Sequence, residues 1–257
     1  MLAGVSTDYY ARLERGNLTG VSDSVLDAIA RALRLDEAEV AYLRDLTRVA
    51  NSAPRARRRP SQPRGIRTNV RRVLDGMTDV PAIVMNGRLD LLATSTLGAA
   101  LYSPAFGDER PVNLARFCFF DPQARALYPH WDEAANTTVA MLRTEAGRHP
   151  YDRELSDLIG ELSTRSDTFR DRWANHNVRL HSTGSKLYHH PVVGPLTLEY
   201  DVMDIAADDG LSLTAFTAAD PASKDGLVLL ASWAATRMRE DGDSRSQSNV
   251  EHTADDV

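Results

Sequence analysis

Cysteine is nearly missing from this sequence, because Cys118 is the only one among 257 residues. No disulfide can therefore form within the chain, and a zinc site built on paired cysteines is excluded. Lysine is almost as scarce. Lys186 and Lys224 are the only two, so arginine carries nearly all of the positive charge.

Long apolar runs are also missing. Gly226 to Ala235 is among the most apolar stretches, and it falls far short of the roughly 18 apolar residues that a membrane helix needs. The N-terminus has no charged segment followed by an apolar one, so a secretory signal is not expected. We therefore predict a cytoplasmic protein with no membrane partner.

What is present is the composition of a globular protein, with 42% hydrophobic and 26% charged residues. The net charge of −6 argues against indiscriminate binding of nucleic acid, but the charges are unevenly placed. Eight arginines and no acidic residue lie between Arg55 and Arg72, whereas acidic residues dominate from Glu199 onward. This asymmetry suggests that only one end of the chain approaches a polyanion.

Residues 1–50 have the pattern of three short helices. Ser6 can cap a first helix that ends at Gly16, and Ser22 can cap a second helix with apolar residues at helical spacing. Asp36 followed by Glu39 forms an acidic variant of the capping box, which opens a third helix. We predict a compact all-α unit.

Residues 51–65 differ from their neighbours, because they hold three prolines and five arginines without apolar periodicity. They indicate a linker, which is either a solvated tether or an additional source of phosphate affinity. Residues 66–236 mix strands and helices, with a hairpin at Asn86-Gly87, and predict an α+β domain with an antiparallel sheet and covering helices. The tail, 237–257, is predicted to be disordered, since its polar residues lack periodicity.

The predicted elements of this second domain are read from residue patterns. Two strands open it, a helical middle section follows, and three strands and a closing helix end it. Helices are expected at 66–77, 121–127, 132–146, 153–162, 166–176 and 222–235, and strands at 81–86, 89–93, 178–189, 196–205 and 211–218.

The stretch from Leu2 to Gly16 (LAGVSTDYYARLERG) resembles the turn and recognition helix of the Cro/repressor class of helix-turn-helix proteins, the XRE type. Gly4 lies where the turn between two helices needs a permissive backbone. The positions that pack the recognition helix in this class are matched by Val5, Tyr10 and Leu13. The resemblance implies a bacterial transcription regulator that binds double-stranded DNA.

The resemblance places Thr7, Asp8 and Arg12 where this class meets base edges. Arg12 suits guanine, Thr7 the thymine methyl group and Asp8 the amino group of cytosine. Tyr9 and Arg15 are positioned for phosphate contacts. The alternative is an ordinary amphipathic helix, on whose solvated face Asp8 and Arg12 pair at i,i+4 spacing.

Only Met1 to Ala3 precede this motif, whereas the class has about 20 to 25 residues in two helices before the turn. The helix-turn-helix is therefore expected to be partial. Either translation starts upstream of Met1, or the chain has lost the scaffold of its recognition helix. In the second case the protein is a ligand-binding or protein-interaction module that no longer binds DNA.

From Leu74 to Ala235 the chain is similar to the ligand-binding domain of the MmyB-like regulators. The blocks that carry the resemblance are FFDPQAR (119–125), LYPHW (127–131), LRTEAGR (142–148), ELS (161–163), FRDRWANH (169–176) and HPVVGPLTL (190–198). The family implies a PAS-like sheet with helices over one face and a pocket for a small apolar metabolite, such as a fatty acid. Thr94-Ser95 departs from the family, which often has Trp-Asn there, and puts any pocket contact at this position in doubt.

Large apolar side chains of this domain are candidates to line such a pocket, although each is equally suited to an ordinary core. Arg143 and His190 are the polar candidates for meeting a ligand head group, while Arg143 can equally pair with a carboxylate or face solvent. The predicted ligand-binding residues are Phe117, Phe120, Trp131, Met141, Arg143, Trp173, His190 and Tyr200.

Neither a metal site nor an enzyme is predicted. His189 and His190 are adjacent on a predicted strand and therefore point to opposite faces, and no His-x-x-x-His pattern supports a metal. The sequence has no G-x-S-x-G elbow, glycine-rich phosphate loop or H-E-x-x-H motif. Cys118 lies in an apolar run, which is typical of a core position.

These observations predict a regulator that binds operators as a homodimer and needs no cofactor, apart from a small-molecule ligand. Ligand binding in the larger domain would shift the equilibrium between two dimer geometries and so change operator affinity. The rival hypotheses are the module without DNA binding and an enzyme acting on a small metabolite.

Overall fold

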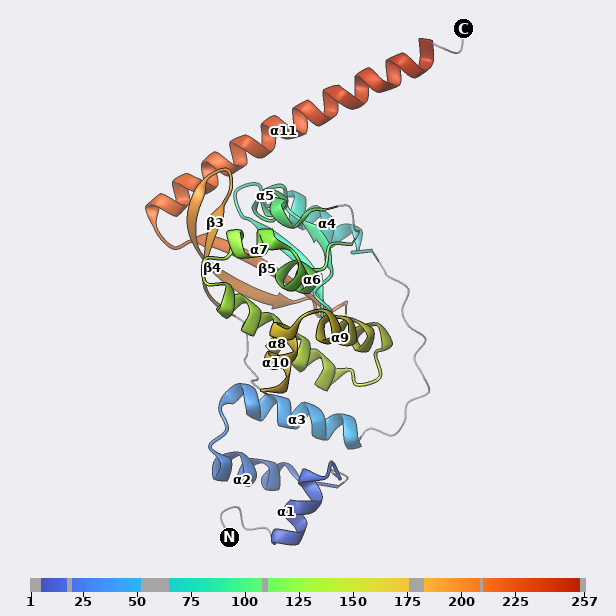
Figure 1. Ribbon diagram of the computed structural model, residues 1–257, viewed down its shortest axis with the longest axis vertical. Helices are drawn as coiled ribbons and strands as arrows, with labels where there is room; N and C mark the ends of the chain where they lie inside the picture. The colour runs from blue at the N-terminus through green and yellow to red at the C-terminus, as the bar shows by residue number, and fades with distance from the viewer. Residues whose placement is uncertain are drawn as a thin grey trace. The chain divides into compact units, whose positions relative to one another are not determined.

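The computed structural model describes residues 6–17, 20–51, 65–107, 111–175, 183–208 and 210–254. These residues form helices and a five-stranded antiparallel sheet, so the predicted α+β class is confirmed (Figure 1). The chain divides into two compact units: Met1–Arg64 with Asp132–His181, and Gly65–Trp131 with Ser182–Val257. The predicted turn residue Gly4 and the predicted packing residue Val5 lie outside the described residues, as do linker residues 52–64.

The first unit is helical in the part of it that the structure describes. Its N-terminal segment contributes three helices, and residues 132–181 contribute three more. The helices are α1 (Thr7–Glu14), α2 (Asp23–Leu33), α3 (Glu37–Asn51), α8 (Trp131–Arg148), α9 (Arg153–Arg165) and α10 (Asp167–Ala174).

Local signals explain where α1 and α3 begin. The Ser6 hydroxyl accepts a hydrogen bond from the Tyr9 amide at 3.2 Å, and α1 is followed by Gly16, whose φ of +84° suits glycine. Asp36 and Glu39 form the predicted capping box, since each backbone amide donates to the other's carboxylate at 2.9 Å.

The start of α2 differs in detail from the prediction. Ser22 occupies the N-cap position but makes no capping bond, because its hydroxyl pairs with that of Ser24 at 2.9 Å. A small apolar core formed by Leu13, Val21, Leu26 and Ile29 joins α1 to α2. This core requires one side of α1 to face α2 and leaves the opposite side exposed.

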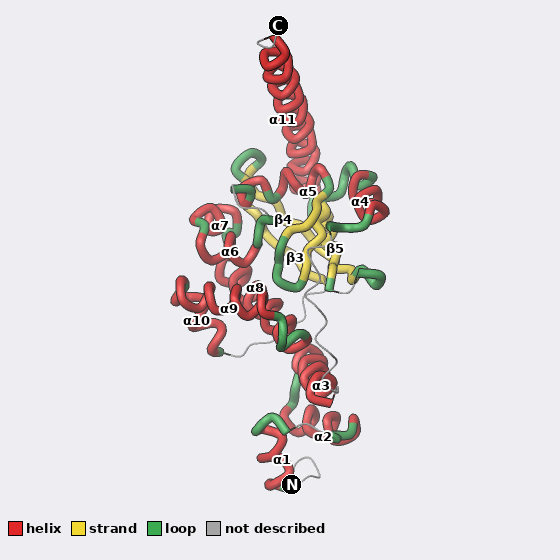
Figure 2. The backbone as a smooth tube through the Cα atoms, turned by 90° about the vertical axis from the view of Figure 1, so that its right-hand side faces the viewer, coloured by secondary structure: helices red, strands yellow, loops and turns green. Residues whose placement is uncertain are grey.

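The sheet, drawn in yellow in Figure 2, belongs to the second unit. Its strand order is β2-β1-β5-β4-β3. All of its pairings are antiparallel, as predicted. The strands are β1 (Ala82–Asn86), β2 (Leu91–Thr94), β3 (Thr183–His190), β4 (Gly194–Asp204) and β5 (Leu211–Ala218). The remaining elements of this unit are α4 (Thr68–Asp75), α5 (Thr96–Leu101), the short 3-10 helix η1 (Ser103–Ala105), α6 (Leu114–Phe120), α7 (Pro122–Leu127) and α11 (Pro221–Ala254).

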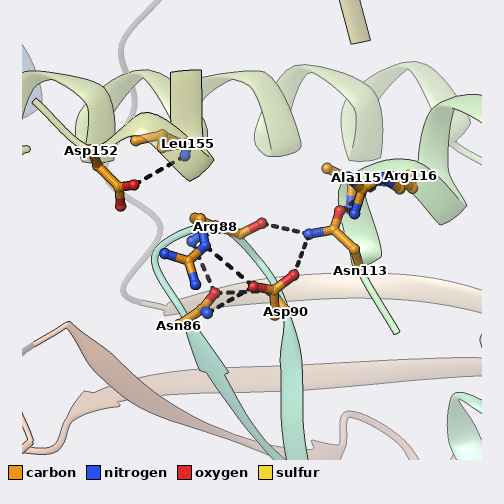
Figure 3. A network of polar contacts seen from close by, with 8 residues as sticks. All are labelled: Asn86, Arg88, Asp90, Asn113, Ala115, Arg116, Asp152 and Leu155. Atoms are coloured by element: carbon orange, nitrogen blue, oxygen red, sulfur yellow. Dashed lines mark hydrogen bonds and ion pairs between the residues drawn. The ribbon is translucent and has the colours of Figure 1, made fainter. Parts of the chain in front are cut away.

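The predicted hairpin of β1 and β2 is present, but its connection is longer than the two-residue turn that Asn86-Gly87 suggests. The left-handed backbone position is Leu89, with φ of +65°. Asp90 accepts hydrogen bonds from the side chains of Asn86, Arg88 and Asn113 at 2.8 to 3.3 Å (Figure 3). This polar network, rather than the glycine, holds the turn.

Helix α4 covers one face of the sheet (Figure 2). Leu74, which is fully buried, packs there among strand residues of β1, β2 and β5. We call this set the aliphatic cluster: Leu74, Ala82, Val84, Ala93 and Leu213. It consists of small and branched apolar side chains, which pack densely without polar groups to satisfy.

The opposite face of the sheet carries most of the unit's buried aromatic side chains. Antiparallel register puts cross-strand partners, and every second residue along a strand, on one face. We call it the tyrosine face and define it by its strand residues Lys186, Tyr188, His190, Tyr200, Thr214 and Phe216. Helix α7 contacts β3, helix α11 contacts β4 and β5, and helix α5 contacts β1 and β2.

Ser95, one of the two residues at which the sequence departs from the resemblance described above, is a buried structural residue. Its hydroxyl accepts from the amides of Ala82 and Gly98 at 2.9 and 3.0 Å and donates to the Val80 carbonyl at 3.0 Å. The hydroxyl thus caps α5 and ties it to β1. These three bonds account for a serine at this place.

Helix α11 extends from Pro221 to Ala254 and so includes most of the range 237–257. The disorder expected for this range stays a prediction. The sequence has no proline, the residue type that breaks a helix most strongly, after Pro221.

Candidate functional site

Three buried tyrosines, Tyr102, Tyr128 and Tyr188, meet over the tyrosine face, and we call them the tyrosine cluster. Tyr188 comes from β3, Tyr102 follows α5, and Tyr128 follows α7. The hydroxyls of Tyr102 and Tyr188 are 3.0 Å apart and share a hydrogen bond. The ring of Tyr188 lies 5.7 Å from that of Tyr128 and 6.2 Å from that of Phe216. The second unit therefore has a polar centre within an aromatic core.

Lys186 lies beside the tyrosine cluster. It precedes Tyr188 by two residues on β3 and so shares its face. Its ammonium nitrogen is 3.9 Å from the ring centre of Tyr128 and 5.3 Å from that of Tyr188. Such positions over ring faces are cation–π contacts. Burial lowers the pKa of Lys186 to about 8, against which the nearby Cys118 acts in the opposite direction.

The tyrosines are held in their neutral form. Burial raises the pKa of Tyr102 to about 12, although its side-chain hydrogen bonds to Tyr188 and Tyr128 act to lower it. Burial also raises the pKa values of Tyr128 and Tyr188 well above the ordinary value for tyrosine. Near neutral pH the cluster thus combines neutral hydroxyls with one cationic side chain.

Sequence reasoning missed Lys186 and the three tyrosines. The signal that could have found the lysine is its spacing, because Lys186, Tyr188 and His190 alternate along one strand. The second signal is its scarcity, since Lys224 is the only other lysine in the chain.

His190, a predicted head-group residue, is completely buried. Its Nδ1 accepts from the Val192 amide at 3.2 Å, which leaves Nε2 protonated to donate to the Ala100 carbonyl at 3.0 Å. Burial lowers the pKa of His190, in keeping with this neutral tautomer. Both ring nitrogens therefore have protein partners.

The other predicted ligand residues of the second unit lie around the same aromatic core. Phe117 is buried and meets the ring of Tyr128 edge-on at 6.1 Å. The Trp131 indole donates to the Cys118 carbonyl at 3.0 Å, and Phe120 is partly buried on α6. Tyr200, half-buried on β4, lies 6.3 Å from Phe216. Their role in ligand binding stays a prediction.

Arg143, Met141 and Trp173 belong to the first unit. The buried Arg143 donates to the backbone carbonyl of Trp173, and its guanidinium lies 4.7 Å from the centre of the Trp173 ring. Trp173 in turn stacks on Phe169 at 5.6 Å, while Met141 is partly buried on α8. Arg143 and Trp173 are thus brought together as a pair, and burial lowers the Arg143 pKa.

The predicted DNA-reading residues lie on α1 or directly after it. Thr7, Asp8 and Arg12 are exposed, whereas Tyr9 is partly buried against the core of α1 and α2. The Arg12 guanidinium lies 5.2 Å from the Tyr9 ring centre. Arg15 is exposed, and its Nε donates to the Ala11 carbonyl at 3.0 Å. Their contacts with DNA stay predictions.

Helices α3 and α8 contact each other within the first unit. Arg148 of α8 forms an ion pair with Asp45 of α3 at 3.0 Å. A Cβ atom added to Gly147 would overlap the ring of Tyr42, so a glycine is what lets this ring approach α8. The N-terminal helices are therefore joined to a helix of the larger predicted domain.

Two further features concern ligands and membranes. Among the side chains that the structure describes, no three histidines, cysteines or acidic residues gather as a metal site would require. His176 and His181 are not among them. Nor does any helix in the described ranges combine the length and apolar character needed to span a membrane.

A comparison with known families identifies the larger domain. A family model described as the MmyB-like transcription regulator ligand binding domain matches residues 66–230, which is more than half of the chain. The matched range contains all five strands of the sheet and the tyrosine cluster. No curated protein matches the chain. The resemblance of this domain is confirmed, while that of the N-terminal helices to the Cro/repressor class stays a prediction.

Proposed function

The chain belongs to the MmyB-like transcription regulators, and on this premise we propose that it binds DNA operators with α1 under the control of a small ligand. The protein acts as a homodimer, with one α1 in each of two half-sites about one helical turn of DNA apart. The ligand has an apolar body and binds at the tyrosine face. Its binding changes operator affinity and involves no catalysis.

One observation carries the proposal for DNA binding. Leu13 is buried against α2 while Thr7, Asp8 and Arg12 are exposed on α1. A recognition helix needs this division, because its base-reading side chains must remain free when the helix is anchored. The contact of α3 with α8 supports the proposed control, since it joins the DNA-reading helices to the family domain.

The proposal is tested by selecting duplexes from a randomised pool with the purified chain and mapping protection on the enriched sequence. We expect a symmetric site with two half-sites, and a loss of at least tenfold in its affinity with Arg12→Ala, because one bidentate guanine contact contributes about 1–3 kcal/mol. Arg153→Ala removes an exposed arginine from α9 and is the matched control. Enrichment of no sequence would refute DNA reading and favour a ligand-binding module.

A further inference from the structure

Helix α11 has one side anchored in the second unit and the opposite side exposed. It packs on α5, β4 and β5 (Figure 1), and Gly226 lets it approach Leu196 of β4 closely, because a Cβ atom at this position would overlap the leucine side chain. On the opposite side, Val228 and Leu229 are 60% and 62% exposed. Among the described residues, no other large aliphatic side chain is more exposed. Such a pair on an anchored helix suits contact with another molecule.

The exposed side continues at helical spacing in both directions from this pair. Exposed residues recur at intervals of three or four along the helix, so their side chains lie on one face. We call it the outer face of α11 and define it by six exposed residues: Asp225, Val228, Leu229, Ser232, Thr236 and Arg239.

The two hydroxyl groups of the outer face already have acceptors. The Ser232 hydroxyl donates to the Val228 carbonyl at 3.1 Å, and the Thr236 hydroxyl donates to the Ser232 carbonyl at 3.1 Å. A partner that covers them therefore leaves no donor without an acceptor. The middle of the outer face can thus be buried at the low cost of an apolar surface.

The two ends of the outer face carry opposite charges. Asp225 precedes Ser232 by seven residues, and Arg239 follows it by seven. Seven residues are about two turns, so both charges lie on the same side of the helix as Ser232, about 10 Å from it in opposite directions. In an antiparallel pair of α11 helices centred on Ser232, Asp225 of each copy therefore meets Arg239 of the other. A parallel pair would instead place like charges side by side.

We propose that the outer face of α11 binds the same face of a second copy of this chain, antiparallel and around a twofold axis at Ser232. Val228 and Leu229 form its apolar centre, and an ion pair between Asp225 and Arg239 closes each end. A twofold interface requires a self-complementary surface of this kind. The inference rests on the proposed function, because it names the surface through which that homodimer forms. One helix pair is a small interface, so the dimer dissociates on dilution.

Sedimentation velocity of the full chain over a range of concentrations measures this association. Leu229→Glu should raise the dissociation constant of the dimer at least tenfold, because it places two carboxylates in the apolar centre. Val73→Glu is the matched control, since it alters an aliphatic side chain of similar exposure, 56%, on α4 and should associate as the wild type does. Circular dichroism verifies folding. A wild type that stays monomeric, or a dimer that Leu229→Glu does not weaken, overturns the inference.

Exchange of the charges tests the antiparallel orientation. Asp225→Arg and Arg239→Asp should each weaken the dimer by about tenfold, because each turns both ion pairs into contacts between like charges. An equimolar mixture of the two variants should associate as the wild type does, since every cationic end then meets an anionic one. A mixture that associates no better than either variant alone would overturn the proposed pairing.

The result is separable from that of the DNA experiment, because sedimentation needs no DNA. A dimer that Leu229→Glu weakens, without enrichment of any duplex, would leave the inference standing and refute the proposed DNA reading. Enrichment of a site with two half-sites, by a dimer that Leu229→Glu does not weaken, would leave DNA reading standing and overturn the inference.

Discussion

Each face of the sheet in the second unit carries a set of buried side chains, and the two sets differ in kind. The aliphatic cluster under α4 consists of Leu74 with alanine, valine and leucine residues and contains no titratable group. The tyrosine face buries a histidine and a threonine hydroxyl, and it partly buries a lysine whose ammonium lies over aromatic rings. Burying polar groups lowers stability unless they are fully satisfied, so substitutions on the two faces should change stability differently.

The largest expected effect is on the aliphatic cluster. Leu74→Ala removes a fully buried side chain and should lower the free energy of unfolding by about 2–5 kcal/mol, because the surrounding strands cannot close the cavity. Urea denaturation measures this change. Val73→Ala, at a neighbouring position that is 56% exposed, is the control and should alter stability by less than about 0.5 kcal/mol. Equal effects at both positions would contradict the assigned core.

On the tyrosine face we expect substitution of Lys186 to raise the free energy of unfolding, the opposite of the effect of Leu74→Ala. Lys186→Met replaces a partly buried cation, which lies over aromatic rings, by an apolar side chain of similar length. The free energy of unfolding without ligand should therefore rise by about 0.5–2 kcal/mol. The same denaturation experiment measures it. A loss of stability would mean that the ammonium is already satisfied within the protein, and the two faces would then not differ in the way described.

The pH dependence of stability is a second test of the contribution of Lys186. Lys186 has a pKa of about 8 in the folded protein and an ordinary value of 10.5. Between these values the unfolded chain binds more protons, so stability rises with pH from about 8 toward 10. Above 10 the raised pKa values of Tyr102, Tyr128 and Tyr188 reverse the trend, because unfolded tyrosines ionise first. Denaturation between pH 7.5 and about 10 should show that the free energy of unfolding rises with pH in wild type and not in Lys186→Met. If it rises equally in both proteins, Lys186 is not the group responsible.

The smallest expected effect concerns Thr214. Its buried hydroxyl has no hydrogen-bond partner among the described residues. Thr214→Val keeps the shape and removes the hydroxyl, so stability should rise by up to about 1 kcal/mol. Thr217→Val, exposed on the same strand, should leave stability unchanged. If Thr214→Val is destabilising, the hydroxyl is satisfied by water or another group.

Much of the fold followed from local signals in the sequence. The capping box of Asp36 and Glu39 fixed the start of α3, and the predicted strand 211–218 coincides with β5. Each of these signals is complete within a few residues. Alternation and caps therefore predict elements well where the local pattern and the final environment agree.

Two short helices were not predicted. Helix α5 depends on Ser95, whose hydroxyl is held by β1 as well as by the helix, a tertiary contact that the sequence does not show. Helix α6 lies in the apolar run LARFCFF, in which helical and strand periodicities cannot be distinguished. Both failures come from short segments whose structure is set by distant partners.

The candidate site was predicted only in outline. The resemblance led to the correct domain, but the polar residues singled out were Arg143 and His190, which both have partners inside the protein. Lys186 was not singled out, since a lysine in an alternating strand usually points to solvent. Only the register of β3 with β4 places it on the buried face.

The most direct test measures ligand control of DNA binding. The affinity for the selected duplex is measured by fluorescence anisotropy with and without dodecanoate, a fatty acid of the kind that the resemblance implies, in wild type and in Lys186→Met. We expect dodecanoate to change the wild-type affinity by at least about fivefold, in either direction, and to leave that of Lys186→Met unchanged. Binding of dodecanoate to wild type without any change in DNA affinity would contradict ligand control by the tyrosine face.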